Sequence, residues 1–238
     1  LFLTTKMSWD YEIVVVGGGT TGAAACYHLA NAGVKNVLCV EMGRVGKGLD
    51  AEFQTSISGS GDDEAKYAPF NSGSSVFSGG EKGPRTIKMI VTALPYKSIE
   101  EYEDLHGFAG TKAYIDATAY GRELQKSLAR KLLPSPKEQL KELGSIMLGE
   151  SSELDELRSE FQKFTSLGCE CSWVDSNGLK NFPGVASGFV AGIYFPHDAV
   201  IDSESYAQAL LAEAARRGSV TLREGVLVQG LEPLAQGG

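Results

Sequence analysis

Two short apolar runs lie near the start of the chain, Ile13–Val16 and Val37–Val40. Runs of this length that are rich in β-branched residues are typical of strands buried on both faces of a parallel sheet. Between them, residues 20–32 favour a helix, and Gly33 suits the left-handed position that follows one. The pattern therefore predicts a β-α-β unit, a crossover that is nearly always right-handed.

Helical patterns dominate the middle of the chain. Pro84 fits the first position of a short helix through residue 90. The spacing Ser98-x-x-Glu101 fits a capping box, in which two side chains satisfy free backbone N–H groups at a helix start. Apolar positions then recur at helical spacing over residues 111–133, and a proline ends this pattern. We expect a helical segment here.

The last hundred residues alternate between helical and strand-like patterns. An amphipathic helix is predicted over residues 154–164, closed by Gly168, and another is predicted to begin at a capping Ser203 and to end at Gly218. Short strands are predicted at residues 145–148, 193–195, 220–222 and 226–228. The alternation favours an α/β fold.

Composition narrows the class of protein. The 238 residues are 42% hydrophobic and 22% charged, as in ordinary globular proteins, and the net charge is −8. An acidic chain is a poor partner for nucleic acid or an anionic membrane. No apolar run approaches the roughly 20 residues that span a bilayer. We therefore expect a small-molecule substrate, no nucleic-acid partner and no membrane span.

The four cysteines indicate a reducing compartment. Cys26 and Cys39 lie within apolar patterns and are interpreted as buried hydrophobic residues. Cys169 and Cys171 lack the second cysteine or histidine cluster that a zinc site needs. We expect a cytoplasmic protein, or one of an organelle matrix if a transit peptide has been lost.

A glycine motif follows the first predicted strand and opens the first predicted helix. It reads Gly17-Gly18-Gly19-Thr20-Thr21-Gly22, a G-x-G-x-x-G pattern in the context that dinucleotide binding requires. The first glycine permits a tight turn, the second lets the backbone approach a pyrophosphate, and the third lets the helix pack on the strand. The N-terminus of the helix then offers free N–H groups to the phosphates.

An acidic residue completes this motif at the end of the second predicted strand. Glu41 can accept hydrogen bonds from the hydroxyls of the adenosine ribose, and it disfavours the 2′-phosphate of NADP. Met42 follows it and belongs to the same predicted cofactor site. The alternative is a glycine-rich turn with a surface charge. We favour dinucleotide binding because the strand, glycines, helix, second strand and carboxylate occur in order.

The second half of the chain carries a family resemblance. Leu-Lys-Asn-Phe-Pro-Gly at residues 179–184 is followed by Gly-Ile-Tyr-Phe-Pro-His-Asp-Ala-Val-Ile-Asp at 192–202, a helix, and Val-Leu-Val-Gln-Gly-Leu-Glu at 226–232. This order resembles the D-amino-acid oxidase superfamily, which includes sarcosine oxidase and glycine oxidase. The resemblance implies a Rossmann-like FAD-binding domain of the glutathione-reductase type with part of an inserted α+β substrate domain.

The resemblance also implies how the chain divides. We expect the first part of the FAD-binding domain at residues 7–95, a helical segment with part of the substrate domain at 96–174, and a return to the FAD-binding domain at 175–238. Members of the superfamily continue well beyond this length. We therefore expect a C-terminally truncated chain, whose strand at 226–228 would be an exposed sheet edge.

The implied activity is FAD-dependent oxidation of the C–N bond of a small amine or amino acid, which gives an imine. By resemblance, Val228 would lie beside the adenine, and Gly73, Ser74 and Ser75 match a small-residue loop near the pyrophosphate and the flavin. The alternatives are an FAD-dependent 2-hydroxy-acid or glycerol-phosphate dehydrogenase, an NAD-dependent dehydrogenase, and a non-catalytic dinucleotide-binding fragment.

Two cations are candidate substrate ligands. Arg85-Thr-Ile-Lys88 resembles an Arg-x-x-Arg near the flavin of sarcosine oxidases, where an arginine holds the substrate carboxylate. A lysine supplies a point charge without the bidentate fork of an arginine. A solvated helix face explains Arg85 and Lys88 equally well. His197, in the family-like stretch, is interpreted as a structural or solvated loop residue.

Overall fold

The computed structural model describes residues 11–46, 88–95 and 98–232. These residues fall into two compact units. Of the described residues, the first unit holds 11–46, 88–89, 132–134 and 202–232, and the second holds 90–95, 98–131 and 135–201. Each unit is described by itself. The domain boundaries expected from the family resemblance remain a prediction, because these units are defined by contacts alone.

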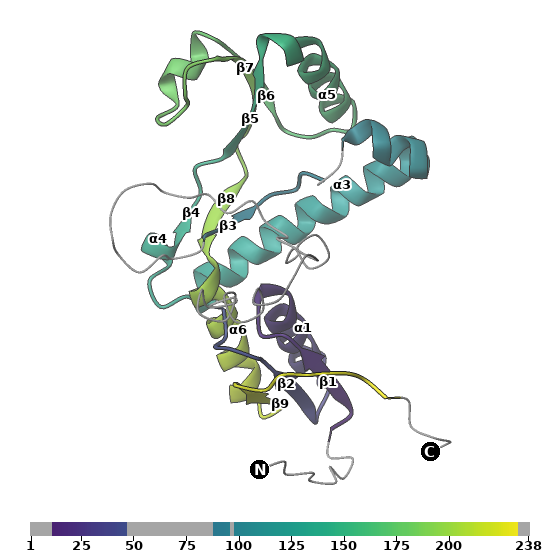
Figure 1. Cartoon of the computed structure of the whole chain (residues 1–238), viewed down its shortest axis with the longest axis vertical. Helices are drawn as coiled ribbons and strands as arrows, with labels where there is room; N and C mark the ends of the chain where they lie inside the picture. Colours follow the sequence, from purple (N-terminus) through teal and green to yellow (C-terminus); the bar gives the residue numbers. More distant parts are fainter. Residues whose placement is uncertain (1–10, 47–87, 96–97, 233–238) are drawn as a thin grey trace, which may run out of the picture. The chain divides into compact units, whose positions relative to one another are not determined.

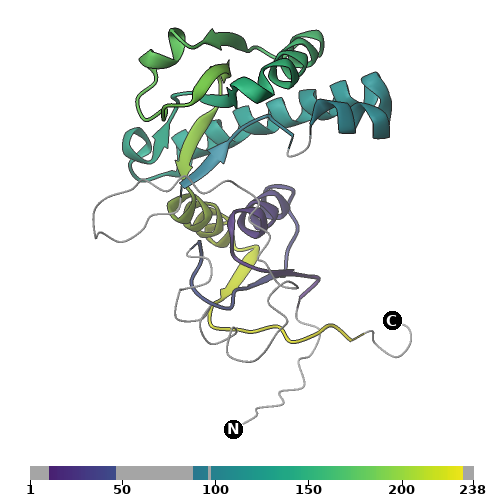
Figure 2. The ribbon, with the colours of Figure 1, turned by 45° about the horizontal axis from the view of Figure 1, so that its top comes forward.

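The first unit is built on a three-stranded parallel sheet. Its order is β1 (Ile13–Val16), β2 (Val37–Val40) and β9 (Val220–Arg223), and the register pairs Val14 with Leu38 and Leu38 with Thr221. All four residues of β2 are buried, as expected for the central strand. Helices α1 (Thr20–Asn31) and α6 (Ser203–Arg216) pack against each other beside this sheet (Figures 1 and 2).

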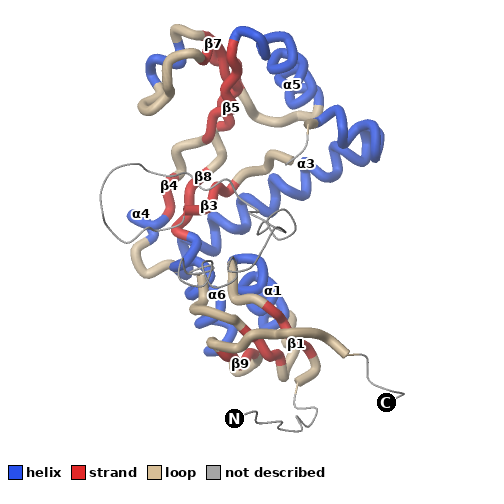
Figure 3. Tube along the Cα trace, in the orientation of Figure 1, coloured by secondary structure: helices blue, strands red, loops and turns tan. Residues whose placement is uncertain are grey.

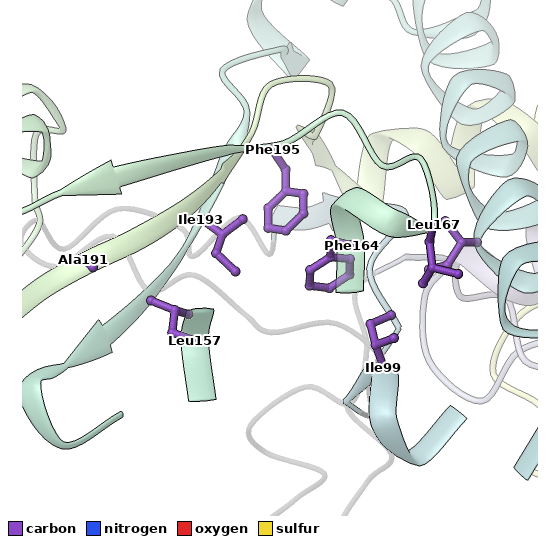
Figure 4. Close-up of a cluster of buried hydrophobic side chains, with 8 residues drawn as sticks. Ile99, Leu157, Phe164, Leu167, Ala191, Ile193 and Phe195 are labelled. Carbon is purple, nitrogen blue, oxygen red and sulfur yellow. The ribbon is translucent and has the colours of Figure 1, made fainter. Parts of the chain in front are cut away.

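The second unit contains an antiparallel sheet with a helix packed against it. The central strand β7 (Phe189–Phe195) pairs with β5 (Ser145–Glu150) and with β6 (Ser172–Asp175). Helix α5 (Leu154–Ser166) packs on β7. Figure 4 shows the core that this packing buries. It contains Ile99, Ile115, Leu157, Phe164, Leu167, Ala191, Ile193 and Phe195. Burial of these side chains is the main force that holds the sheet and helices together.

Shorter elements complete the described chain. The longest helix is α3 (Ile99–Leu132), which breaks at Gly107, where φ is 66° and ψ is 170°. Figure 3 shows the small strands of the sheet β3-β8-β4. Their bounds, with those of the remaining short helices, are β3 (Lys88–Val91), α4 (Pro136–Gln139), β4 (Leu140–Lys141), η1 (Ser151–Glu153), η2 (Gly178–Asn181) and β8 (Ala199–Asp202). Within the described ranges, no helix combines the length and apolarity needed to cross a bilayer.

Several predictions from the sequence are confirmed. Both apolar runs near the start are strands joined by a helix, and Gly33 has the left-handed φ of 82°. Ser98 and Glu101 form the capping box: each backbone N–H donates to the other's side chain, at 3.3 Å from Ser98 N and 3.2 Å from Glu101 N. Cys26 and Cys39 are fully buried.

Three predictions are wrong. The short helix predicted at residues 84–90 is wrong for residues 88–90, the part that the structure describes. Lys88–Val91 form strand β3, and Val91 is buried. Ser203 is not the cap of α6: the Asp202 carboxylate accepts the N–H of Ser205 at 2.8 Å, so the cap is one residue earlier. Residues 226–228 form no strand, because the N–H of Val226 bonds to the turn after β2 and forms no ladder.

Candidate dinucleotide-binding site

The glycine loop connects β1 to α1. Gly17 has φ of 101°, a conformation that favours glycine, and its N–H donates to the carbonyl of Val40 at 2.8 Å. A Cβ on Gly22 would lie 1.9 Å from the carbonyl oxygen of Gly17. Glycine at position 22 is therefore required by the close approach of α1 to the loop, as the sequence predicts.

Gly19 is a glycine for a different reason. It is exposed, its φ of −68° suits any residue, and an added Cβ would meet no atom within 4 Å. Within the described chain, neither the backbone conformation nor the packing at position 19 requires a glycine. The open space over Gly19 is what the backbone approach of a pyrophosphate requires.

The N-terminus of α1 is free to bind an anion. Gly19 is its N-cap and supplies no side-chain hydrogen bond, and the first turn holds no acidic residue. The first N–H groups of a helix, here at Thr20, Thr21 and Gly22, have no partner inside the helix and carry a partial positive charge. This start of α1 has the composition and polarity that suit a phosphate group.

Glu41 lies directly after β2 and contacts the glycine loop. Its carboxylate accepts the N–H of Gly18 at 2.5 Å and the N–H of Gly43 at 2.8 Å. An ionised carboxylate has about four acceptor positions, so these two bonds leave capacity for ribose hydroxyls. Sequence reasoning did not foresee that Glu41 also fixes the conformation of the loop. Its predicted contact with the ribose stays a prediction.

The segment that follows Glu41 is anchored within the first unit. Met42 is half-buried, and Val45 is 3% exposed with its N–H bonded to the Glu224 carboxylate at 2.8 Å. The N–H of Val226 donates to the carbonyl of Glu41 at 3.0 Å, which places residues after β9 beside this turn. Val228 is half-buried further along that segment. Its predicted place beside the adenine is a proposal.

Of the other predicted site residues, Gly73, Ser74, Ser75 and Arg85 lie outside the described residues. Lys88 is the first residue of β3. The prediction that Arg85 and Lys88 share one helical face therefore fails at Lys88, because Lys88 lies in a strand. In the described part of the chain, no group of His, Cys, Asp and Glu side chains is arranged to hold a metal ion.

A second polar cluster, in the other unit, was missed by sequence reasoning. Asp198 is 1% exposed, and its carboxylate accepts hydrogen bonds from Ser145 Oγ at 2.6 Å and from Arg122 Nη1 at 3.3 Å. Lys126, 3% exposed, donates to the carbonyl of His197 at 2.9 Å. These bonds tie α3 to the turn between β7 and β8. The sequence shows only the acidic residue after Pro196, and nothing in it reveals these partners.

Comparisons with known proteins agree with the geometry. The sequence model of a family described as FAD dependent oxidoreductase (DAO) matches residues 12–238. No curated protein matches the chain significantly. Glycine oxidase from Geobacillus kaustophilus is similar in structure, with a TM-score of 0.58 and 21% identity over 90% of this chain and 46% of that chain.

Two further solved structures show the same fold. Glycine oxidase from Bacillus cereus has a TM-score of 0.56 and 14% identity, over 94% of this chain and 50% of that one. L-α-glycerophosphate oxidase from Mycoplasma pneumoniae, solved with FAD bound, has a TM-score of 0.53 and 15% identity, over 91% of this chain and 45% of that one. The chain thus spans about half the length of these structures.

Proposed function

Because the chain belongs to the DAO family of FAD dependent oxidoreductases, we propose that its protein oxidises the C–N bond of a small amine or amino acid. The observation that carries the proposal is the free N-terminus of α1 behind the open glycine loop, with a carboxylate after β2. When bound, FAD would supply a hydride acceptor for the carbon beside the amine nitrogen. The substrate also loses one proton from nitrogen and is released as an imine.

The residues present fit the pyrophosphate and the ribose of the cofactor's adenosine diphosphate half. The N–H groups at the start of α1 would bind the pyrophosphate, and Gly19 would let it approach. Glu41 would accept from the ribose hydroxyls while it holds Gly18 in place. Met42, Val228 and the loop Gly73-Ser74-Ser75 are proposed to complete the cofactor site.

The substrate class is supported by the resemblance and by the names of similar structures. Glycine oxidases and an iminodiacetate oxidase from Chelativorans are among them, and each name specifies an amine that carries a carboxylate. Such a substrate needs a cation, because an unpaired carboxylate in a partly buried site is costly. Either Arg85 or Lys88 alone is proposed as that cation. The proposal does not require the two residues to share a helical face.

A second candidate function is FAD-dependent oxidation of glycerol phosphate or a 2-hydroxy acid. The similarity to glycerophosphate oxidase favours it, because its TM-score of 0.53 is close to that of the glycine oxidases. A shared fold does not select between these substrates. The two functions differ in the atom beside the oxidised carbon, nitrogen or oxygen, and substrate-dependent reduction of the flavin separates them.

The cofactor assignment is tested by charge reversal at Glu41. Glu41→Arg removes the ribose acceptor and should weaken FAD binding by roughly tenfold or more, about 1.4 kcal/mol. Glu12→Arg is the matched control, since Glu12 is an exposed acid next to β1. Because Glu41 also holds the loop, Glu41→Gln should fall between the wild type and Glu41→Arg. Equal FAD affinity in wild type and Glu41→Arg would place the ribose elsewhere.

The substrate class is tested in anaerobic mixtures of the FAD-loaded protein with sarcosine, glycine, D-proline, L-2-hydroxyglutarate and glycerol 3-phosphate. We expect loss of flavin absorbance with at least one of the amines. Arg85→Ala should then raise KM for amino acids sharply and change little for an uncharged amine. Reduction by the hydroxy acid or glycerol 3-phosphate alone would favour the second candidate. Bound flavin that no compound reduces would indicate a non-catalytic dinucleotide-binding protein.

A further inference from the structure

Two cysteines that have no part in the proposed function lie one residue apart, at Cys169 and Cys171. They belong to the segment between the end of α5 and the start of β6. The structure describes all four cysteines of the chain, and each is a free thiol. Cys26 and Cys39 are fully buried, whereas Cys169 and Cys171 are half-buried. A reagent in solution can therefore reach the second pair and not the first.

The side chains of Cys169 and Cys171 lie on the same side of this segment. Both pack against the hydrophobic core of the second unit, the cluster drawn in Figure 4. Glu170, between them, points away from that core, because its side chain is 77% exposed and pairs with His197 at 2.5 Å. Alternation of this kind is what an extended segment produces. The two thiols therefore face the same surroundings.

The separation of the two cysteines suits a disulfide bond. Two residues of chain span at most about 7 Å, so the Cα atoms of Cys169 and Cys171 are no further apart than this. Disulfides join Cα atoms that are roughly 4.4–6.8 Å apart. Closure therefore requires at most a small shortening of the segment. The exposed ion pair between Glu170 and His197 opposes that movement only weakly, because exposed pairs contribute little stability.

A small reagent has a path to Cys169. A cavity of about 160 Å³ is lined by Cys169 and Glu170, together with residues of α3 and of the turn between β7 and β8. Because Glu170 is largely exposed, the cavity reaches the surface at this residue. Its volume is below the roughly 300–1,000 Å³ of pockets for drug-sized ligands, so it suits a small molecule.

Both thiols are protonated at neutral pH. Burial, and to a lesser degree the charge of Cys171, raise the pKa of Cys169 to about 11. Burial also raises the pKa of Cys171, and a hydrogen bond with Thr165 offsets part of that rise. The thiolate is the species that attacks a disulfide, so exchange at pH 7 should take minutes to hours.

We propose that Cys169 and Cys171 form a redox-active dithiol, a modification site for low-molecular-weight disulfides. The thiolate of one cysteine attacks a sulfur atom of the reagent RSSR, forms a mixed disulfide and expels RS⁻. The other cysteine then attacks the protein sulfur of the mixed disulfide and expels the second RS⁻. The two thiol protons pass to these anions, so the dithiol loses two electrons and two protons, and RSSR becomes two RSH. Neither step requires FAD.

The first test incubates the reduced, FAD-free chain with bis(2-hydroxyethyl) disulfide, blocks the remaining thiols in denaturant and digests the protein with trypsin. The peptide of residues 164–180 contains Cys169 and Cys171, and Cys26 and Cys39 lie in two other peptides. We expect the 164–180 peptide to lose two hydrogen atoms and to regain them with dithiothreitol. Cys26 and Cys39 should react at least about ten times more slowly. No disulfide within residues 164–180, or equal reaction of Cys26 and Cys39, overturns the proposal.

The second test removes one sulfur atom at a time. Cys169→Ser and Cys171→Ser should each stop at the mixed disulfide and retain one hydroxyethylthio group, whereas the wild-type chain should retain none once its disulfide has closed. Ser172→Ala, at an exposed position beside Cys171, is the matched control and should close as the wild type does. A stable adduct on the wild-type chain, or none on either cysteine variant, would show that the two cysteines do not act as a pair. Circular dichroism of each variant verifies that it folds, and every outcome leaves the FAD assignment intact because the flavin is absent.

Discussion

Gly19 and Gly22 belong to one motif but meet different surroundings. A Cβ at Gly22 would collide with the carbonyl of Gly17 at 1.9 Å, and backbone cannot move aside as a side chain tip can. A Cβ at Gly19 would meet no atom within 4 Å. The motif therefore combines a residue that the fold requires with one that only a ligand requires. A sequence pattern treats the two alike, and only the coordinates separate them.

Alanine at each position tests this difference. Gly22→Ala should lower the free energy of unfolding by about 1–3 kcal/mol, the usual cost of forcing extra atoms into packed structure. Gly19→Ala should change it by about 1 kcal/mol or less, since its backbone conformation suits alanine. The same Gly19→Ala should weaken FAD binding roughly tenfold or more. Urea unfolding and FAD titration of both variants measure these effects. Unchanged FAD affinity in Gly19→Ala would contradict the assigned role.

Glu160 gives the fold a dependence on pH. Its carboxylate accepts the N–H of Ile99 at 3.4 Å, and burial raises its pKa above the ordinary 4.5. A group with a raised pKa in the folded state contributes stability below pH 4.5 that is lost as pH rises through the folded value. Glu160→Gln keeps an acceptor for Ile99 without the charge. Its stability relative to wild type should therefore increase between pH 4.5 and 7.

The control for this prediction is Glu138→Gln, since Glu138 is exposed on α4. Denaturant unfolding at several pH values gives the free energies of all three proteins. If the Glu160→Gln difference changes no more than the Glu138→Gln difference from pH 4.5 to 7, the carboxylate at position 160 is not desolvated in the folded protein.

At the scale of elements, local patterns located most helices and strands but not all of their ends. Residues 88–91 contain a short apolar run that suits a strand or a helix equally, and pairing with β8 decides for the strand. At the start of α6, Asp202 and Ser203 are both residue types that favour the N-cap position. The sequence alone therefore does not distinguish between them. In the structure, Asp202 is the N-cap because its backbone is extended, with φ of −66° and ψ of 104°.

The cap of α6 leads to an element-scale prediction. Asp202→Ala removes the acceptor for the N–H of Ser205 and should lower the free energy of unfolding by about 0.5–2 kcal/mol. Asp202→Asn should retain most of that stability, because asparagine caps as well as aspartate. Urea unfolding compares the two. Equal loss in both variants would mean that the charge of Asp202, and not its cap bond, stabilises the helix.

At the scale of the whole molecule, the dinucleotide loop was predictable and the polar cluster around Asp198 was not. The requirements of the loop lie within about thirty residues of sequence, so its strand, glycines, helix and carboxylate can be recognised in order. The polar cluster joins Arg122 to Asp198 across 76 residues and Ser145 to Asp198 across 53. Such pairs carry no local pattern, since any polar residue at either position fits the sequence equally well.

The assignment of the glycine loop as the cofactor site gives a prediction for the whole chain. A ligand that binds only the folded state stabilises it by about 2.7 kcal/mol at one hundred times its Kd, and the regions that contact it open less often. FAD should therefore slow amide hydrogen exchange most at the start of α1 and at Glu41. Exchange measured by mass spectrometry with and without FAD gives the protection of each segment. Protection of α3 with none at α1 would reject the assignment of the glycine loop as the cofactor site.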